Sequence, residues 1–417
     1  MKKTLFISRY APPSIGGAPQ VMYTLMRDLP QESYVMLTSF YNIDSVSAEI
    51  GSWLNGKYIF YDNKNASKSF IASSPTKIQK KGRNVINNLR YVAKRSKIIR
   101  DLIGIPIIFI QLYSIVLTGR QTIKNNRIEV IMGFSDYGPA LIGSYILHKI
   151  TKTKLTLLIF DVYKGNLYPF PGNFMAALFE KLILVASSKV LVTNKATKDL
   201  YIERYGDEVE EKIVVMHNPT PVDHSKIDLK PYSPRSPYKI VFTGSVYWPQ
   251  IGSLQNLVKA IENTDMRLEI YSATPKSVLE KEGLLTKEVD FMGTAPASDM
   301  PKVQGDADLL FLPLSWNTKN QVIVDTATPG KLADYLTSGR PILIHSPKSS
   351  CISQYGKEHH FALVVDENNP EILRSSILEF FKNPGETGDE LVRNAKNFYD
   401  KYFNVKKNIE IFRSVLF

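Results

Sequence analysis

The stretch TPGKLADYLTSGRPIL, Thr328 to Leu343, predicts a short helix that leads directly into a buried strand. Pro329 suits the first turn of a helix, and Gly339 suits the position just past its end. Three apolar residues are spaced as one inward-facing stripe: Leu332, Tyr335 and Leu336. The strand then starts after Arg340-Pro341, so the stretch indicates a helix followed by a strand of a sheet.

Two charged residues stand near the start of this helix. Lys331 and Asp334 are three residues apart and therefore share one face. A cation at that place can meet a phosphate, and a carboxylate can accept hydrogen bonds from two ribose hydroxyls. An amphipathic helix with a surface ion pair accounts for the same residues, and the stretch by itself does not decide between the two interpretations.

Outward from this stretch, short apolar runs alternate with helix-length segments, which is typical of βαβ units and a mostly parallel sheet. Seven strand candidates lie in the first half, from TLFIS at 4–8 to KIVVM at 212–216. Six lie in the second half, from YKIVFTG at 238–244 to FALVV at 361–365. The sequence therefore predicts an α/β fold with two doubly wound, Rossmann-like sheets.

The length of 417 residues favours two domains, because one hydrophobic core rarely organises so long a chain. A proline-rich seam between His217 and Ile240 has no sustained periodicity and is typical of a linker. We expect a first domain over 1–225, a linker over 226–238 and a second domain over 239–395. A C-terminal helical segment over 396–417 ends on an apolar face and is expected to pack toward the first domain.

Composition excludes several classes of protein. Hydrophobic residues make up 44% and charged residues 22%, which excludes a disordered or fibrous chain. Cys351 is the only cysteine, which excludes a disulfide framework or a multi-cysteine metal site within one chain and indicates a reducing, cytoplasmic setting.

Two glycine-containing loops follow strand candidates. Gly16 and Gly17 come after the first strand and before a helix, where backbone N–H groups and a helix N-terminus favour a phosphate. Gly244 and Ser245 end the first strand of the second domain, where a nucleoside diphosphate lies in Rossmann folds. Taken alone, the Gly16-Gly17 pair is more often ordinary turn chemistry, and a structural turn is also the alternative for Gly244 and Ser245.

Taken together, these segments resemble a glycosyltransferase of the GT-B fold and of the large retaining family 4, which includes bacterial lipopolysaccharide and capsule enzymes. Four landmarks match in order over almost the whole length. They are the Gly16-Gly17 loop, the HNPTPVD segment with Asn218, Pro219, Val222 and Asp223, the strand end with Phe242, Gly244 and Ser245, and the helix that contains Lys331. The resemblance implies two Rossmann-like domains that face a central cleft.

The resemblance also implies site residues. Asp334 stands where the family's E-x7-E motif has its second glutamate, which binds ribose, and Thr326 stands at or near the first glutamate. Asp136 and Asp161 occupy strand ends where the family places a histidine or an acid near the reacting sugar, although either aspartate can instead cap a helix. The implied donor-binding residues are Gly16, Gly17, Gly244, Ser245, Phe291, Met292, Gly293, Thr326, Thr328, Lys331 and Asp334.

The sequence departs from the family where an arginine and a lysine usually clamp the donor phosphates. Here that loop offers Ser245 and Gln250. A leaving diphosphate develops negative charge, so another cation is needed. We predict that Lys331 supplies this cation, and Lys319 and Arg9 are the alternatives. The predicted catalytic residues are therefore Asp136, Asp161 and Lys331.

We expect no metal and no cofactor besides the donor substrate. Asp306 and Asp308 are separated by one residue, as in a metal-binding carboxylate pair, but they precede a buried strand, where aspartate is a common turn residue. The resemblance implies no required metal, and the six histidines lack a convincing ligand spacing.

The net charge of +12 is concentrated in the first half. Residues 1–230 hold 31 basic and 18 acidic side chains, whereas residues 231–417 hold 21 and 22. The stretch Lys77–Arg100 has nine basic residues and no acidic one, and the apolar run Leu102–Leu117 follows it. Because this run is shorter than a membrane span, we interpret the pair as a patch that binds an anionic membrane surface. A solvated face is the alternative, and no nucleic-acid motif accompanies the charge.

These observations predict a glycosyltransferase that moves a sugar from a nucleoside diphosphate donor to a hydroxyl of a glycan or lipid-linked acceptor, with retention, in bacterial surface polysaccharide synthesis. We expect it in the cytoplasm, peripheral on the inner face of the cytoplasmic membrane. The alternatives are a catalytically silent scaffold of the same fold that binds nucleotide sugars, motivated by the missing cations, and a GT-B-fold epimerase.

Overall fold

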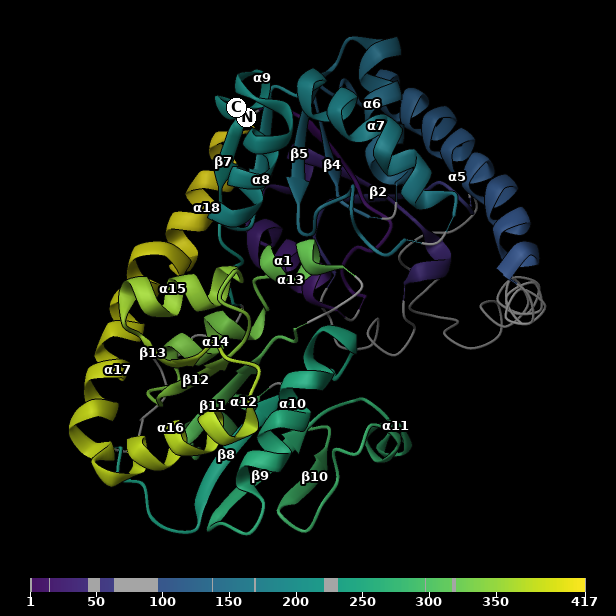
Figure 1. Cartoon of the computed structure of the whole chain (residues 1–417). Helices are drawn as coiled ribbons and strands as arrows, with labels where there is room; N and C mark the ends of the chain where they lie inside the picture. The colour runs from purple at the N-terminus through teal and green to yellow at the C-terminus, as the bar shows by residue number, and fades with distance from the viewer. Residues whose placement is uncertain are drawn as a thin grey trace. The chain divides into compact units, whose positions relative to one another are not determined.

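The structure, a computed structural model, divides into two compact units (Figure 1). It describes residues 2–14, 16–43, 53–63, 97–136, 138–168, 170–220, 232–296, 298–316 and 320–416, with the backbone alone over 97–103. Unit 1 comprises Met1–Pro221 and Val405–Phe417, and unit 2 comprises Val222–Asn404.

Unit 1 is built on a seven-stranded sheet with the order β3-β2-β1-β4-β5-β6-β7, in which every neighbouring pair is parallel. Its strands are β1 (Thr4–Ile7), β2 (Tyr34–Thr38), β3 (Lys57–Phe60), β4 (Val130–Phe134), β5 (Lys154–Ile159), β6 (Lys189–Val192) and β7 (Ile213–Val215). The central strands β1, β2 and β4 are buried along their whole length, because helices cover both faces of a parallel sheet.

Helices connect these strands. Unit 1 contains α1 (Gly17–Met26), α5 (Lys97–Asn126), α6 (Pro139–Thr151), α7 (Gly172–Ala186), α8 (Lys195–Tyr205), α9 (Asp207–Glu210), α18 (Val405–Ser414) and the 3₁₀ turns Gln31–Ser33 and Phe40–Asn42. The apolar run Leu102–Leu117 lies inside α5. Within the described residues, no helix has both the length and the apolar character that a membrane crossing requires.

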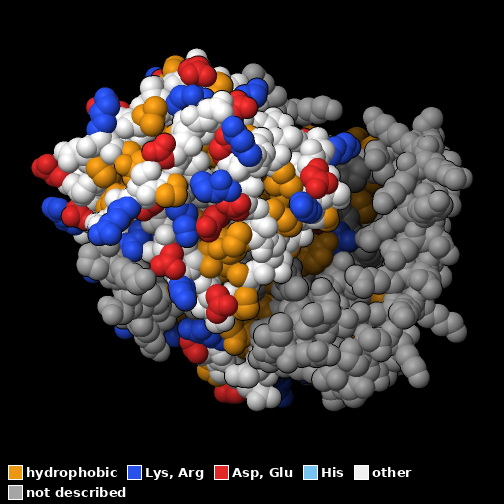
Figure 2. All heavy atoms as spheres, turned by 90° about the horizontal axis from the view of Figure 1, so that it is seen from below, with side chains coloured by type: hydrophobic (Ala, Val, Ile, Leu, Met, Phe, Trp, Pro, Cys, Tyr) orange, Lys and Arg blue, Asp and Glu red, His pale blue; other side chains and the backbone are white. Residues whose placement is uncertain are grey.

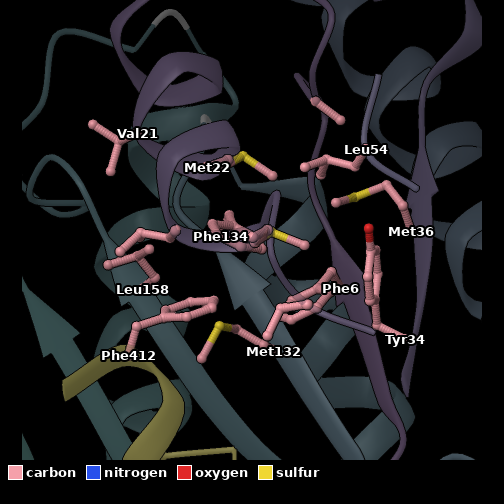
Figure 3. Close-up of a cluster of buried hydrophobic side chains, with 14 of the residues drawn as sticks. Phe6, Val21, Met22, Tyr34, Met36, Leu54, Met132, Phe134, Leu158 and Phe412 are labelled. Atoms are coloured by element: carbon pink, nitrogen blue, oxygen red, sulfur yellow. The ribbon is translucent and has the colours of Figure 1, made fainter. Parts of the chain in front are cut away.

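The core on one side of this sheet includes the last helix of the chain (Figure 3). Phe412 of α18 is fully buried, and its ring stacks on Phe6 of β1 with the ring centroids 6.1 Å apart. Met132 and Leu158, from β4 and β5, belong to the same cluster. The C-terminal helix therefore completes the core of unit 1.

Unit 2 is built on a six-stranded parallel sheet with the order β10-β9-β8-β11-β12-β13. Its strands are β8 (Tyr238–Thr243), β9 (Met266–Tyr271), β10 (Val289–Gly293), β11 (Leu309–Pro313), β12 (Ile342–His345) and β13 (Ala362–Val365). Its helices are α10 (Trp248–Ile261), α11 (Lys276–Lys281), α12 (Met300–Gly305), α13 (Gln321–Asp325), α14 (Lys331–Thr337), α15 (Cys351–His359), α16 (Pro370–Lys382) and α17 (Pro384–Phe398), followed by the π-helical turn Tyr399–Phe403.

The stretch Thr328–Leu343 forms the expected helix and strand, although Pro329 lies before the N-cap Gly330 and not in the first turn of the helix. Helix α14 follows Pro329 and Gly330, and the predicted stripe of Leu332, Tyr335 and Leu336 is buried. Gly339 has a φ of +69° beyond the end of the helix, a conformation that glycine adopts without strain, and β12 begins at Ile342. With two parallel-sheet α/β units of Rossmann type, the predicted fold class is confirmed.

The observed boundaries differ in detail from those expected. The chain passes from unit 2 to unit 1 at Val405 and not at residue 396, because Phe398 stacks on Phe361 at 4.6 Å within unit 2. The first change of unit falls after Pro221. Most of the expected linker over 226–238 lies in 221–231, outside the described residues.

Candidate functional site

The candidate donor site of unit 2 lies at the carboxyl ends of its central strands. The strand order reverses between β8 and β11, so the connections that follow these two strands leave toward opposite sides of the sheet. Such a switch point is where open α/β sheets bind their ligands. Gly244 and Ser245 follow β8, and Ser315 follows β11.

Three neighbouring strand ends are joined by hydrogen bonds at this edge. The N–H of Gly244 donates to the carbonyl oxygen of Tyr271 at 2.9 Å, and the N–H of Ser272 donates to that of Gly293 at 2.7 Å. The predicted loop at Gly244 and the predicted segment Phe291–Gly293 therefore lie at the same end of the sheet, the carboxyl end of its strands, with β9 between them. Phe291 and Met292 also line a small cavity of about 400 Å³ at the outer strand β10.

Lys331 reaches this edge from the start of α14. A Cβ built on Gly244, whose φ is +103°, would lie 3.4 Å from both Cε and Nζ of Lys331. Glycine is therefore needed for the turn and leaves room for the lysine. Tyr335, one turn further along α14, holds its hydroxyl 3.1 Å from the N–H of Thr243, which fixes the helix to the end of β8.

The ammonium group of Lys331 is buried. It lies 3.7 Å from the ring centroid of Phe242, and Nζ has no hydrogen-bond partner among the described residues. Loss of hydration lowers the pKa of Lys331 from its ordinary value of 10.5 to about 7. Because buried polar groups are nearly always hydrogen-bonded, this unpartnered ammonium beside a glycine loop is a candidate to contact an anionic ligand.

The remaining predicted donor residues lie on and before α14. Asp334 is half-buried in the first turn of the helix. Thr326 is buried at the end of α13, and its hydroxyl donates to the carbonyl oxygen of Val322 at 2.7 Å. Thr328 is half-buried between α13 and α14. Lys319, an alternative cation, lies outside the described residues.

In unit 1, three polar residues considered in the sequence analysis follow strands of the sheet: Arg9 follows β1, Asp136 follows β4 and Asp161 follows β5. Asp136 accepts hydrogen bonds from the N–H groups of Gly138, at 2.8 Å, and Ala140, at 3.2 Å, and so caps the start of α6. Loss of water raises the pKa of Asp136 to about 6, although the backbone donors and the charge of Arg9 act in the opposite direction. Asp136 therefore acts as a helix cap, which is one of its two expected roles. A raised pKa is also typical of carboxyl groups that take part in chemistry.

Asp161 lies near Asp136. Neighbouring protein atoms displace part of the hydration of Asp161 and raise its pKa, although the side chain is exposed. Burial raises the pKa of Tyr168, and the charges of Asp161 and Asp136 raise it further. Both carboxylates are therefore within electrostatic reach of this phenol, which the sequence analysis did not identify.

The predicted glycine loop of unit 1 is open. Gly16 has a φ of +142° at the start of α1, and a Cβ built on Gly17 would meet no atom within 4 Å. Gly17 is therefore exposed, with open space on the side where a side chain would project.

A buried carboxylate that the sequence analysis missed supports the loop after β5. Glu180 of α7 is 2% exposed and accepts hydrogen bonds from the N–H of Lys164, from the hydroxyl of Tyr205 at 2.6 Å and from Nη1 of Arg204 at 3.3 Å. The same Nη1 atom donates to the carbonyl oxygen of Lys164 at 2.8 Å. Both backbone polar groups of Lys164, three residues after Asp161, are held in this way.

Carboxylates elsewhere in unit 2 have structural partners. Oδ2 of Asp308 accepts a hydrogen bond from the N–H of Lys239 at 2.7 Å and joins β8 to the segment before β11. Over the part of the chain that the structure describes, no group of three or more His, Cys, Asp or Glu side chains is arranged to hold a metal ion. On the described part of the face in Figure 2, basic and acidic side chains are interspersed.

Known proteins share this fold at low sequence identity. The chain matches no family model, and no curated protein sequence matches it. The structure of Anabaena Alr3699/HepE in complex with UDP and glucose has a TM-score of 0.64 and 13% identity, covering 100% of this chain and 99% of that one. The apo form of the lipopolysaccharide outer core galactosyltransferase WaaB has a TM-score of 0.60 and 13% identity, with 99% of both chains covered.

The fold is also similar to that of a putative epimerase. The putative UDP-N-acetylglucosamine 2-epimerase from Listeria monocytogenes has a TM-score of 0.55 and 13% identity, covering 98% of this chain and 94% of that one. These similarities establish the fold of two Rossmann-like domains, and the activity must be argued from the site.

Proposed function

We propose that this protein is a glycosyltransferase that moves a sugar from a nucleoside diphosphate donor to a hydroxyl of a glycan or lipid-linked acceptor. The observation that carries this proposal is the buried, unpartnered ammonium of Lys331 beside Gly244 at the end of β8. The shared fold with HepE, which was solved with UDP and glucose, supports the donor class. We propose UDP as the first nucleotide to test.

In the proposed reaction the bond between the anomeric carbon and the diphosphate oxygen breaks, and the acceptor oxygen forms a bond to the same carbon. With retention, the acceptor proton passes to the departing diphosphate. Lys331 then stabilises the negative charge on the diphosphate, and its low-dielectric surroundings strengthen that interaction. The Gly244 loop lets the backbone approach, Asp334 accepts from the ribose hydroxyls, and Phe291–Gly293 hold the base. No metal is included in this scheme.

Two residues of unit 1 are proposed to serve the acceptor: Asp136 and Asp161 accept hydrogen bonds from acceptor hydroxyls. Gly16 and Gly17 are proposed to bind the donor, by offering backbone N–H groups to its phosphates. The proposed setting is bacterial surface polysaccharide synthesis at the inner face of the cytoplasmic membrane. Most of the basic stretch Lys77–Arg100, proposed to contact that membrane, lies outside the described residues, and side chains are not described over 97–100.

Binding of a nucleoside diphosphate is expected to take up a proton at pH 8, because Lys331 is largely neutral there and must become charged to meet the diphosphate. Affinity should fall as the pH rises above 7. Calorimetric titration of UDP in two buffers of different ionisation enthalpy measures the proton uptake. Equal heats in the two buffers would contradict the assignment.

The same shift has a consequence for the ligand-free protein. Because the pKa of Lys331 is lower in the folded state than in the unfolded state, the unfolded chain binds more protons between pH 7 and pH 10.5. This contribution makes the free energy of unfolding increase with pH across that window. Chemical denaturation of wild type and Lys331→Met at several pH values measures this contribution, as the difference between their pH dependences of the free energy of unfolding.

Asp136→Asn is expected to lower turnover by about 100-fold while leaving the melting temperature nearly unchanged. The amide oxygen still accepts hydrogen bonds from Gly138 and Ala140, so the cap of α6 persists. Initial rates with the donor found by thermal shift, together with a melting curve, test this expectation. Asp136→Ala provides the comparison, since it removes the cap as well and should cost about 1 kcal/mol of stability. Wild-type turnover in Asp136→Asn would leave only the capping role.

The experiment that tests the function begins with a thermal-shift panel of UDP, GDP, dTDP and their sugars, because a ligand that binds the folded state raises the melting temperature. The stabilising donor is then followed for slow hydrolysis and for transfer to glycan acceptors. Isomerisation of the donor sugar without an acceptor would instead indicate an epimerase.

A catalytically silent scaffold that binds nucleotide sugars is the second candidate. Gln250, at one position where the resembled family clamps phosphate, is 2% exposed in the first turn of α10. Among the described residues near Gly244, Lys331 is the cation that the structure places against the loop. Tight binding with no turnover of any donor would favour this candidate over the transferase.

A further inference from the structure

Exposed apolar side chains gather on one part of unit 1. Of the eighteen large hydrophobic side chains exposed among the described residues, nine lie on α5, on α7 or in the connection before α7. We call this set the α5–α7 surface. It consists of Ile107, Phe109, Ile110, Tyr113, Leu167, Phe170, Phe174, Leu178 and Leu182. Phe109, Ile110, Tyr113 and Phe174 are each more than 60% exposed.

The two helices present these residues on their outer faces. Ile108, Leu112 and Ile115 of α5 are buried, and a Cβ on Gly143 of α6 would lie against Ile115, so that side of α5 packs on α6. Phe109, Ile110 and Tyr113 point away from that side because of the helical period. On α7, the spacing of Phe174, Leu178 and Leu182 likewise forms one outward stripe.

The exposed residues of α5 and of the connection before α7 adjoin one another. A Cβ on Gly104 would lie 3.1 Å from the carbonyl oxygen of Phe170 and 3.2 Å from Cδ of Pro171. Gly104, near the start of α5, therefore contacts the segment that leads into α7, and Figure 1 shows α5, α6 and α7 next to one another. The exposed apolar side chains of α5 meet those of the connection before α7 at this end of the helix.

We propose that the α5–α7 surface docks on an anionic lipid surface. Exposed apolar patches of this extent mark interaction sites. The exposed charged side chains described on the two helices are all basic, namely Arg120, Lys124 and Lys181, although Lys181 also pairs with Glu208 of α9. The acidic side chain described on these helices, that of Glu180, is buried.

Sequence and position add to the basic character. Helix α5 begins at Lys97, directly after most of the basic stretch that starts at Lys77, and its first residues include Arg100 and the acidic Asp101. An apolar face with basic residues beside it fits lipid acyl chains and anionic headgroups together, and the exposed tyrosine Tyr113 suits the boundary between them.

A second copy of this chain is a less suitable occupant. A two-fold contact would bring the basic side chains of two α5–α7 surfaces into one interface, with no acidic side chain described at the surface of either helix to offset them. Anionic lipid removes that repulsion. The inference does not depend on sugar transfer, although it would bring the proposed acceptor site close to lipid-linked substrates.

Flotation of the full chain with phosphatidylcholine vesicles, with and without phosphatidylglycerol, tests the proposal. Wild type should float with the anionic vesicles. The pairs Phe109→Glu with Ile110→Glu, and Phe174→Glu with Leu178→Glu, should each reduce the bound-to-free ratio by about tenfold or more, because carboxylates resist burial in lipid and repel anionic headgroups. The substituted side chains are exposed, so melting temperatures should stay near that of wild type.

The matched control is Ile372→Glu with Leu378→Glu on α16 of unit 2, where both side chains are also exposed. This pair should float like wild type. The proposal is overturned if wild type stays at the bottom with anionic vesicles, or if the α16 pair loses flotation as strongly. It is also overturned if ultracentrifugation shows a dimer that the α5 and α7 pairs dissociate while flotation is unchanged, since a second copy would then cover the surface.

Discussion

Lys331→Met is expected to weaken binding of UDP, or of the nucleoside diphosphate selected by the thermal-shift panel, by about 100-fold. The same substitution should stabilise the ligand-free protein. Lys331 places an ammonium without a hydrogen-bond partner over the ring of Phe242, and burial of such a charge disfavours folding. Methionine keeps an unbranched side chain over that ring and removes the charge. Titration calorimetry and melting curves give the two effects.

The opposite signs of these effects make the test specific. A residue that serves only structure would lose stability and affinity together. Lys348→Met, at an exposed lysine of the same unit, is the matched control and should change neither quantity appreciably. Near-normal affinity in Lys331→Met would move the phosphate contact to another cation, such as Arg9 or Lys319.

Glu180→Ala is expected to destabilise the protein by about 3 to 5 kcal/mol, the range for breaking a buried charged pair from one side. The substitution leaves the hydroxyl of Tyr205, the guanidinium of Arg204 and the N–H of Lys164 without their shared acceptor. Burial raises the pKa of Glu180, and the hydrogen bonds from these donors and the charge of Arg204 act in the opposite direction. Chemical denaturation measures the loss.

The comparison variants separate the network from simple charge removal. Glu180→Gln keeps an oxygen acceptor and should lose less stability than the alanine variant. Glu208→Ala, which breaks the exposed pair with Lys181, should change stability by roughly 0 to 1 kcal/mol. If Glu180→Ala were as mild as Glu208→Ala, the buried network would not hold the loop after β5.

The fold was largely predictable because parallel strands are buried on both faces. The sequence of such a strand is a continuous apolar run. The seven runs of the first half correspond to the strands of the first sheet, and the six runs of the second half correspond to those of the second. The helix α14 was predictable as well, since proline before it, glycine after it and a single buried stripe agree with one another.

The electrostatic state of the site was not predictable from sequence. The surroundings of Lys331 come from Phe242 and Gly244, which are distant in the chain and meet the lysine only through the packing of α14 against β8. The hydrogen bonds of Glu180 were not predictable for the same reason. It is a single acidic residue in an apolar helix, and its three donors belong to other segments of the chain. The spacing of apolar residues on α7 likewise does not tell a buried stripe from an exposed one.

The last helix has a consequence for the order in which the protein folds during synthesis. Phe412, Val415 and Leu416 complete the core around Phe6, yet a ribosome makes them after all of unit 2. Unit 1, which is translated first, therefore completes its core only after α18 has left the ribosome, and until then the apolar surface that receives Phe412 stays open while unit 2 can already fold. Loss of only the final helix at a premature stop codon would leave that surface exposed and make the product prone to aggregation.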